Sequence, residues 1–368
     1  MKVLFCTNAF EKVSNGPAKF AHLILEESKN ADLEIRILTE EIAFETSSVY
    51  KLDLNIRKSF RLFGQFIRMW KYHKAAMRIR KEFEFDVLVY NNAIIGLFSF
   101  LFFKKTVGMI NDYSNAAHSF MDVFKGKAKL NKRILFFYVE RLTCHFSKCI
   151  IVNSEYLKRK LQQQYECSES LFKVLHKGIE DKLILFDRKE GLKKKIAGSI
   201  LFVKTDFELG GLYNLIKSLT DFDRKITLTI AGPAEEHHEM LAGLLRKANI
   251  SFELFGYLTQ EEVYKRMQEA EIFCVPSKRE AFGVANLEAM AMGCKIVSTN
   301  IGGIPEAVNG DRFAWLVKPD DSAALGKAIK AALNSSPEKN MGDIKNHLDH
   351  FSSAKVILKF KKHLQECF

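Results

Sequence analysis

The stretch Ser277-Lys-Arg-Glu-Ala-Phe-Gly-Val-Ala-Asn-Leu-Glu-Ala-Met-Ala-Met-Gly293 decides the fold of this chain. The apolar run before it, Ile272–Val275, stops at a proline and predicts a short buried strand. Residues Val284–Met292 contain neither Pro nor Gly and predict a helix. A strand, a turn at Gly283 and a helix start together offer backbone N–H groups to an anion. The stretch therefore predicts a strand–turn–helix unit that binds an anionic ligand.

Two carboxylates belong to this unit, because Glu280 lies in the turn and Glu288 follows eight residues later. That spacing is about two helical turns, so both side chains can face one ligand. A predicted strand at 295–300 leads into a second glycine turn, Gly302-Gly-Ile-Pro-Glu306. Two such turns suggest a ligand with a diphosphate. The same spacing also fits two ordinary strand-to-helix loops with Glu288 in solvent.

The alternation of strand and helix occurs twice along the chain. The first set of predicted strands is 3–8, 34–39, 87–91, 106–110 and 149–153. The second set is 200–203, 226–231, 252–255, 272–275, 296–299 and 314–317. Two such arrays in 368 residues predict two Rossmann-like domains with parallel sheets. We expect domains at 1–183 and 184–350, a linker within 180–199, and a C-terminal helix at 351–368 that could pack back on the first domain.

The composition, 47% hydrophobic and 27% charged, is that of a soluble globular protein. The longest apolar run, Ala93–Phe103, has 11 residues and is too short to cross a bilayer, so it predicts a buried helix. The first residues lack signal-peptide features. The seven cysteines are scattered, and Cys6, Cys149 and Cys274 lie in predicted strands. This pattern predicts reduced, buried thiols in a cytoplasmic protein.

Positive charge is concentrated in one part of the chain. Residues 51–200 carry 30 Lys and Arg against 14 Asp and Glu, a net +16, so the rest of the +12 chain sums to −4. The segment 56–81 predicts a basic amphipathic helix with a stripe at helical spacing, made of Phe60, Phe63, Ile67, Trp70, Lys74 and Met77. Two interpretations stay open: attachment to an anionic membrane surface, which would place the protein peripherally on the inner face of the membrane, or a domain helix with core aromatics.

In several motifs the chain resembles the retaining glycosyltransferases of family 4, which have the two-domain GT-B fold. Glu280 and Glu288 resemble the family's E-x7-E signature. Four further segments resemble other family motifs in the same order, namely Met1–Phe5 with Asn15-Gly16-Pro17, Ile151–Leu157, Leu175–Ile179 and Gly302–Glu306. The resemblance covers nearly the whole chain and implies an α/β GT-B protein whose two Rossmann-like domains face an inter-domain cleft.

The resemblance implies a role for each matching residue in binding a nucleotide diphosphate sugar. Glu288 would accept hydrogen bonds from the ribose hydroxyls, and Glu280 would contact the donor sugar. The distal phosphate would be held by the backbone N–H groups of Phe282, Gly283 and Val284.

Two further residues complete the implied donor site. Gly16 would let the first-domain loop approach the diphosphate, and the backbone near Tyr257 would meet the base. Members with this fold need neither a metal nor another cofactor, because cationic side chains neutralise the leaving diphosphate.

The chain departs from the family pattern at two places. Thr205 and Gly210 occupy positions where the family has Arg and Lys, so Lys204, Lys278 or Arg279 would have to supply the cation. Asn111, at the end of a predicted strand, stands where many members have a histidine that donates to the transferred sugar. An asparagine can also donate a hydrogen bond but carries no charge. Glu280, Asn111 and Lys204 are therefore the expected catalytic residues.

The leading hypothesis is a retaining, metal-independent transfer of a hexose to a glycan or lipid-linked acceptor in cell-surface polysaccharide synthesis. The missing Arg and Lys motivate an alternative, a GT-B protein that binds a nucleotide sugar or a partner without transfer. No nucleic-acid-binding signature is present, and no nucleic acid partner is expected. The first strand lacks a following G-x-G-x-x-G, which argues against a dinucleotide dehydrogenase.

Overall fold

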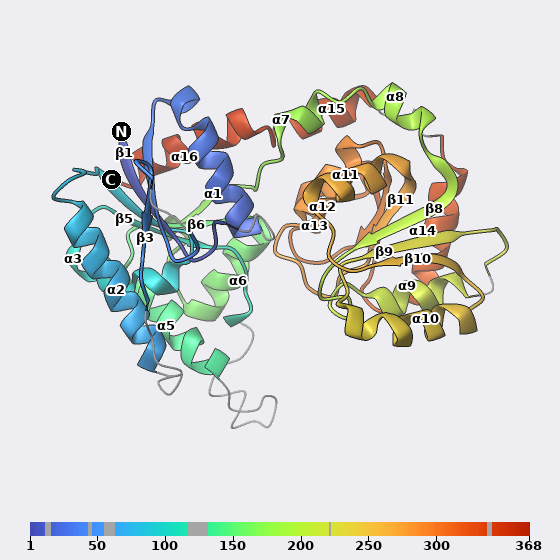
Figure 1. Ribbon diagram of the computed structural model, residues 1–368, viewed down its shortest axis with the longest axis horizontal. Helices are drawn as coiled ribbons and strands as arrows, with labels where there is room; N and C mark the ends of the chain where they lie inside the picture. The colour runs from blue at the N-terminus through green and yellow to red at the C-terminus, as the bar shows by residue number, and fades with distance from the viewer. Residues whose placement is uncertain (12–15, 43–45, 55–62, 116–131, 221, 337–340) are drawn as a thin grey trace. The chain divides into compact units, whose positions relative to one another are not determined.

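The computed structural model describes residues 1–11, 16–42, 46–54, 63–115, 132–220, 222–336 and 341–368. The chain forms two compact units (Figure 1). The N-terminal unit comprises Met1–Gly178 together with Ser353–Phe368, and the C-terminal unit comprises Ile179–Ser352. The units thus change at 178/179 and 352/353, whereas the sequence placed these boundaries after 183 and 350. The earlier change follows from packing, because Ile179 and Leu183 are buried in the core of the C-terminal unit.

The N-terminal unit contains a seven-stranded parallel sheet with the order β3-β2-β1-β4-β5-β6-β7. Its strands are β1 (Lys2–Thr7), β2 (Glu34–Thr39), β3 (Val49–Lys51), β4 (Val87–Tyr90), β5 (Thr106–Ile110), β6 (Ile150–Val152) and β7 (Phe172–Val174). Most of these strands are buried apolar runs, as expected for a parallel sheet covered on both faces. The short strands β3 and β7 were not predicted from the sequence.

Helices cover both faces of this sheet. They are α1 (Gly16–Glu27), α2 (Phe63–Ile79), α3 (Leu97–Phe102), α5 (Lys132–Phe146), α6 (Glu155–Tyr165) and α16 (Ser353–Glu366), with short 3-10 turns at Lys29–Ala31, Ala93–Gly96 and Glu169–Leu171. Phe5 of β1 packs with Phe20 of α1 and Phe360 of α16 on one face. On the other face Cys6 packs in a cluster with Tyr72 of α2. The alternation of side chains along β1 thus builds two cores.

The C-terminal helix α16 is joined to the sheet by a covalent bond as well as by packing. Cys367 forms a disulfide with Cys149, the residue before β6. The prediction of reduced thiols is therefore wrong for Cys149, because the fold brings together two cysteines that are 218 residues apart in sequence. Cys6 and Cys274, the other two cysteines in predicted strands, are free and buried.

The C-terminal unit contains a six-stranded parallel sheet with the order β10-β9-β8-β11-β12-β13. Its strands are β8 (Ile196–Val203), β9 (Thr227–Ala231), β10 (Ser251–Phe255), β11 (Ala270–Val275), β12 (Lys295–Thr299) and β13 (Ala314–Val317). The segment predicted as a linker, 180–199, instead contains the helices α7 (Asp181–Ile184) and α8 (Arg188–Lys193) and the start of β8. Leu183 and Gly191 are buried and Leu192 is partly buried, so this segment is part of the unit.

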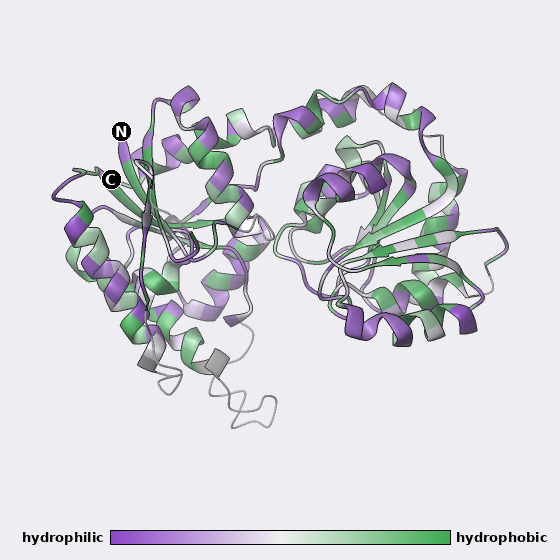
Figure 2. Cartoon of the chain, viewed as in Figure 1, coloured by the Kyte–Doolittle hydropathy of each residue, from purple (hydrophilic) through white to green (hydrophobic). Residues whose placement is uncertain are grey.

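The remaining elements connect and cover the strands of this second sheet. They are α9 (Leu212–Leu219), α10 (His238–Lys247), α11 (Gln260–Glu269), α12 (Val284–Ala291), α13 (Ile304–Val308), α14 (Ser322–Asn334) and α15 (Met341–Asp349), with 3-10 turns at Glu235–His237 and Gly310–Arg312. In both units apolar residues gather in the strands and on the inner sides of the helices (Figure 2). Because the strands of this sheet are parallel, the carboxyl ends of β8, β9, β11 and β12 share one edge of the sheet, where α/β proteins bind ligands.

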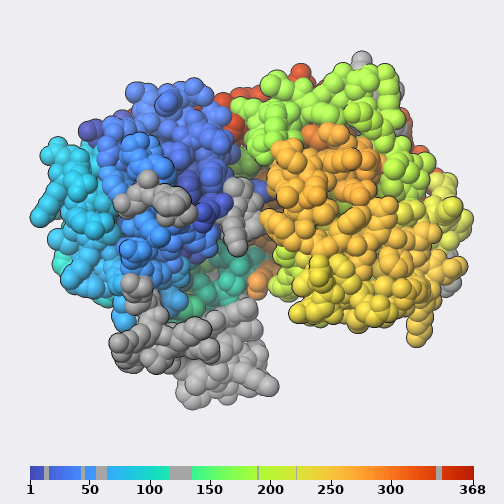
Figure 3. Space-filling view, in the orientation of Figure 1, coloured from blue at the N-terminus to red at the C-terminus, as the bar shows by residue number. Residues whose placement is uncertain are grey.

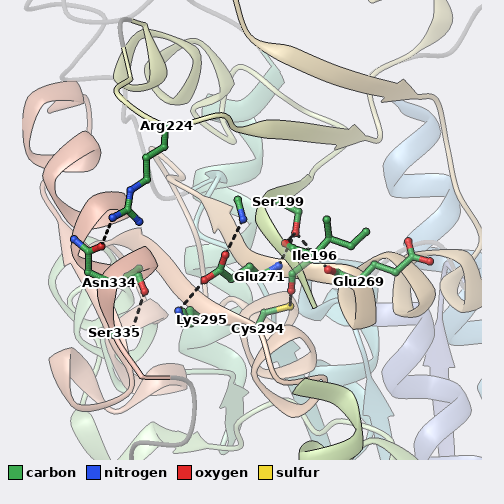
Figure 4. Close-up of polar contacts among 12 residues, drawn as sticks. Ile196, Ser199, Arg224, Glu269, Glu271, Cys294, Lys295, Asn334 and Ser335 are labelled. Carbon is green, nitrogen blue, oxygen red and sulfur yellow. Dashed lines mark hydrogen bonds and ion pairs between the residues drawn. The ribbon is translucent and has the colours of Figure 1, made fainter. Parts of the chain in front are cut away.

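Polar contacts fasten the opposite, amino-terminal edge of this sheet (Figure 4). The carboxylate of Glu271 in β11 accepts hydrogen bonds from the Gly198 N–H at 2.8 Å and from Lys295 Nζ at 2.9 Å. The Glu271 N–H in turn donates to Ser199 Oγ at 2.9 Å. The side chains of Lys295 and Glu271 are only 10% and 17% exposed. This nearly buried ion pair connects three adjacent strands.

Replacing Lys295 with methionine is expected to destabilise the C-terminal unit by about 3 kcal/mol, because it leaves the carboxylate of Glu271 desolvated without its cation. The matched control is Lys330→Met, which removes a pair with Asp223 whose side chains are 46% and 67% exposed. That change should cost about 0.5 kcal/mol. Chemical denaturation followed by tryptophan fluorescence measures both. Equal losses in the two variants would contradict the assignment of a stabilising buried pair.

Helix α2 places part of its apolar stripe in solvent rather than in the core. Tyr72, Ala76 and Ile79 form its buried face, whereas Phe66, Trp70 and Met77 are exposed. Phe102 of α3 is also exposed, and its ring contacts His73 of α2. We call Phe66, Trp70, Met77 and Phe102 the α2–α3 patch; these helices lie at the outer surface of the N-terminal unit (Figure 3).

The interpretation of this predicted stripe as core aromatics is therefore wrong for Trp70, since this residue is 42% exposed. Residues 56–62 of the predicted helix, including Phe60, lie outside the described part of the chain. Within the described residues, no helix combines the length and the apolar character needed to cross a membrane.

Candidate active site

The loops that follow β8, β11 and β12 pack backbone against backbone at the carboxyl edge of the second sheet. A Cβ atom added to Gly302 would lie 1.7 Å from the carbonyl oxygen of Glu280, and one added to Gly211 would lie 2.1 Å from that of Pro276. The Lys278 N–H donates to the Leu209 carbonyl at 2.8 Å. Glycine is therefore required at both positions, and the two glycine loops fix the backbone that carries Glu280.

Gly302→Ala is expected to destabilise the protein by about 3 kcal/mol and to reduce its activity, because the new methyl group must displace the Glu280 backbone. Gly310→Ala is a close control, since Gly310 has φ +60° against +61° for Gly302 but no described atom within 4 Å of its added Cβ. The control should cost only about 1 kcal/mol, the price of the left-handed backbone alone. Thermal unfolding and activity distinguish the two; similar losses would show that the close contact is unimportant.

Lys204, at the end of β8, forms an ion pair with Glu280. Lys204 Nζ lies 2.7 Å from Glu280 Oε2, and both side chains are partly exposed. Gly210 makes room for this lysine, because a Cβ atom at position 210 would lie 2.9 Å from Lys204 Cγ. Gly232, with φ +117°, packs equally closely on the Lys204 backbone. Gly210, at the position where the family has a lysine, thus leaves room for the side chain of Lys204.

Glu288 is buried on α12, and the hydroxyl of Tyr264 lies between it and a second acidic side chain, Glu180. Tyr264 Oη of α11 lies 2.9 Å from Glu180 Oε1 and 3.4 Å from Glu288 Oε1. Burial, followed by the charges of Glu288 and Glu180, raises the pKa of Tyr264, so the hydroxyl keeps its proton. The single proton of this hydroxyl is shared between the two carboxylates, and the shorter contact is the one to Glu180.

The start of α12 is a glycine turn followed by a helix, the local structure that the sequence predicted. Gly283 adopts φ +93° and precedes the first residue of the helix, Val284. Phe282 is buried and its ring contacts Phe351. Asn286 Nδ2 donates to the Gly283 carbonyl at 3.3 Å, which holds the turn. Glu280, the Phe282–Val284 backbone and Glu288 therefore all belong to one rigid turn and helix.

The other residues predicted for the donor site occupy different surroundings. Lys278 Nζ pairs with Asp320 at 3.0 Å, whereas Lys204 pairs with Glu280. Arg279 is partly buried and Tyr257 is 62% exposed. The Gly256 carbonyl accepts a hydrogen bond from the Gly232 N–H at 2.9 Å, which places the loop of Tyr257 beside the loop after β9. Of the three candidate cations, the structure brings Lys204 to Glu280.

In the N-terminal unit Asn111 is part of a network of asparagines. Asn111 Nδ2 donates to the Asn91 carbonyl at 2.7 Å, and Asn153 Nδ2 donates to the Asn111 carbonyl at 2.9 Å. Asn91 Nδ2 in turn donates to the Pro17 carbonyl in the first turn of α1, the helix that begins at Gly16. Asn111 is thus held at the carboxyl end of β5 by β4 and β6, the neighbouring strands.

Glu140 is a candidate that sequence reasoning missed. It is only 3% exposed, on α5, and it lines a pocket of about 220 Å³ next to Asn111. Phe137, Glu140 and Cys144 are spaced three and four residues apart and are all buried, so Glu140 stands on the buried face of an amphipathic helix. A lone carboxylate at a core-facing position was the signal that could have found it. Within the described residues no cluster of three or more His, Cys, Asp or Glu could hold a metal ion.

Comparison with known proteins identifies both halves of the chain. The family described as Glycosyltransferase Family 4 matches residues 14–183, and Glycosyl transferases group 1 matches residues 184–346. A 41.2 kDa uncharacterized protein in the cps region of Klebsiella pneumoniae is 28% identical over 73% of this chain and 72% of its own length. An amylovoran biosynthesis glycosyltransferase of Erwinia amylovora is 39% identical, over 21% of this chain and 20% of its own.

Solved structures share the fold at low sequence identity. A glycosyltransferase from Rickettsia africae is 16% identical with a TM-score of 0.76, covering 100% of this chain and 98% of its own. The Anabaena protein HepE, solved with UDP and glucose, is 17% identical with a TM-score of 0.74, covering 100% of both chains. Two parallel α/β units define a protein of the GT-B class. The chain belongs to the group 1 glycosyltransferases, matching that family in its C-terminal half and Glycosyltransferase Family 4 in its N-terminal half.

Proposed function

We propose that this glycosyltransferase transfers a hexose, with retention, from a nucleotide diphosphate sugar to a glycan or lipid-linked saccharide in cell-surface polysaccharide synthesis. Support for a nucleotide sugar comes from HepE, which was solved with UDP and glucose. Support for the pathway comes from the Erwinia relative named for amylovoran biosynthesis. The finding that carries the proposal is the Lys204–Glu280 pair next to the start of α12.

In the proposed complex Glu288 accepts hydrogen bonds from the ribose diol, and the N–H groups at the start of α12 bind the distal phosphate. Lys204 neutralises the charge that develops on the leaving diphosphate, which is the role of the family's missing Arg and Lys. Glu280 binds a hydroxyl of the donor sugar and holds Lys204 in place. With this cation the proposed reaction needs no metal for the leaving group.

Retention follows if the acceptor attacks on the same face from which the diphosphate leaves. The new bond forms between the acceptor oxygen and the anomeric carbon, the bond from that carbon to the phosphate oxygen breaks, and the phosphate takes the acceptor's proton. No protein nucleophile takes part. Gly16, the backbone near Tyr257 and the hydrogen-bond donor Asn111 are assigned to the diphosphate, the base and the transferred sugar in this proposal.

A second candidate function is binding of a nucleotide sugar without transfer, which Thr205 and Gly210 favour because the family's cations are absent there. The contact of Lys204 with Glu280 favours transfer. A thermal-shift screen of UDP-, GDP-, ADP- and dTDP-hexoses, followed by a nucleotide-release assay with glycan and polyprenyl-linked acceptors, separates the two. Release that depends on the acceptor supports transfer. Binding without release across the acceptors supports the alternative.

Attachment to the cytoplasmic face of an anionic membrane through the α2–α3 patch belongs to the same proposal. The patch presents three aromatic rings next to exposed cations, among them Lys74, Arg78 and Lys104. Aromatic rings insert at the headgroup level, and each nearby cation adds about 1 kcal/mol of attraction to anionic lipid.

Vesicle flotation tests this attachment. The protein should float with vesicles that contain phosphatidylglycerol and should be released by high salt. Trp70→Ser with Phe102→Ser should weaken flotation about tenfold by removing two inserted rings. Met240→Ser removes an exposed apolar side chain of α10 and is the control. A protein that stays off anionic vesicles even at low salt would refute the attachment.

A further inference from the structure

A pocket of about 220 Å³ lies at the carboxyl ends of β1, β4 and β5 in the N-terminal unit. Asn8 lies just beyond the end of β1, Asn91 and Asn92 follow β4, and Asn111 follows β5. Asn115 and Glu140 complete its polar lining with Asp112 and Ser114. Side-chain amides both donate and accept hydrogen bonds, which suits the hydroxyl groups of a sugar ring.

The charge of this pocket is opposite to that of the surrounding sequence. The chain carries a net +12, yet the described residues that line the pocket include Asp112 and Glu140 and no Lys, Arg or His. The described lining, with two carboxyl groups and no cation among its residues, disfavours a phosphate or a carboxylate, because like charges repel strongly away from water.

Glu140 is held in this wall by two neighbours. Tyr165 Oη at the end of α6 donates to Glu140 Oε2 at 2.5 Å, and Asn115 Nδ2 donates to Glu140 Oε1 at 3.3 Å. Burial, with a smaller contribution from Asp112, raises the pKa of Glu140 to about 7. Among the described residues, the other titratable groups near Glu140 are Cys144, on the same helix, and Cys167, which interacts with Cys144.

We propose that this pocket binds an uncharged sugar ring of the acceptor and that Glu140 is the specificity residue that rejects anionic sugars. The inference rests on the proposed transferase function, whose acceptor it restricts to a neutral, hydroxyl-bearing saccharide at this position. The Glu140 carboxyl group exchanges hydrogen bonds with a sugar hydroxyl but faces a uronate carboxylate with like charge when it is ionised.

The discrimination should depend on pH in a defined direction. As the pH falls through about 7, Glu140 gains a proton and becomes neutral, so its repulsion of an anionic sugar is lost. Affinity for a uronate should therefore rise on the acid side, while affinity for a neutral glycoside should change less.

The test uses ligand-observed NMR with the full chain and no donor. The probes are the methyl α-glycosides of glucose, galactose and mannose, each compared with its uronate at pH 6 and pH 8. At pH 8 the wild type should bind at least one neutral glycoside on the order of tenfold more tightly than its uronate. Glu140→Gln, which keeps the shape of the side chain and one acceptor oxygen, should lose most of this discrimination, with only the repulsion from Asp112 left, and should remove the pH dependence.

Glu166→Gln is the matched control, because it neutralises an exposed carboxylate paired with Arg141, the residue next to Glu140. It should leave the discrimination unchanged. No neutral glycoside binding at millimolar concentration, or discrimination that is the same in Glu140→Gln as in the wild type, overturns the proposal. Because no donor is present, these outcomes are independent of transfer; glycoside binding without acceptor-dependent nucleotide release would instead refute only the transferase function.

Discussion

Lys204→Met should lower the turnover of nucleotide-sugar transfer by about 100-fold or more while leaving donor binding within about tenfold, because in the proposed mechanism the lysine neutralises charge that grows as the diphosphate leaves. The methionine keeps the length of the side chain and its packing against Gly210. Steady-state and single-turnover kinetics with the donor found in the screen measure the effect. The variant also leaves Glu280 without its cation at 2.7 Å, so part of the loss will come from a misplaced carboxylate.

Two further variants separate these contributions. Lys278→Met removes a cation of the same region that pairs with Asp320 and should change turnover less than about threefold, as an exposed ion pair does. Lys204→Gly combined with Gly210→Lys returns the cation to the position at which the family has it and should recover part of the lost turnover. Full activity in Lys204→Met, or an equal loss in Lys278→Met, would remove Lys204 from the mechanism.

Glu288→Ala should weaken nucleotide-sugar binding by about 100-fold, because in the proposed complex it removes two hydrogen bonds from the ribose to a charged acceptor. The fold should survive, because the hydroxyl of Tyr264 keeps its shorter bond to Glu180 at 2.9 Å. Calorimetric titration with the donor and with the free nucleoside diphosphate measures the loss, which should be the same for both since both contain the ribose.

The control for Glu288→Ala is Glu239→Gln, an exposed acid on α10 that pairs weakly with Arg246. It removes one negative charge from the same unit and should leave the affinity unchanged. An unchanged donor affinity in Glu288→Ala, with the control behaving as expected, would sink the assignment of the carboxylate to the ribose.

The sequence predicted most strands because buried parallel strands are continuous apolar runs. Ile272–Val275 and Thr106–Ile110 are examples, and both are strands in the structure. The start of β8, Ile196-Ala-Gly-Ser199, was missed because it contains no such run. It is held by Glu271, which is distant in sequence but lies on the adjacent strand β11. The Cys149–Cys367 disulfide was missed for the same reason, since only the return of α16 to the first sheet brings its partners together.

The parts of the candidate site that are close together in sequence were predicted, whereas the contacts between segments distant in sequence were not. Glu280, Gly283 and Glu288 follow one another in a turn and a helix, so their spacing alone predicted a common ligand. The contact of Tyr264 with both Glu180 and Glu288 depends on how α11 packs, and no local pattern contains it. Lys204 was one of three candidate cations, and the structure distinguishes them because Gly210 and Gly232 set its backbone and leave room for its side chain.

The return of α16 to the first sheet means that the C-terminal unit is an insertion in the N-terminal one. Residues 179–352 form one unit that is continuous in sequence, whereas a fragment ending at Gly178 would expose the side of Phe5 and Phe20 that Phe360 covers. Met1 and Cys367 border the same apolar cluster, so a short peptide could join the two ends. A circularly permuted gene opened at 178/179 would then encode the C-terminal unit first and the whole N-terminal unit as one uninterrupted stretch.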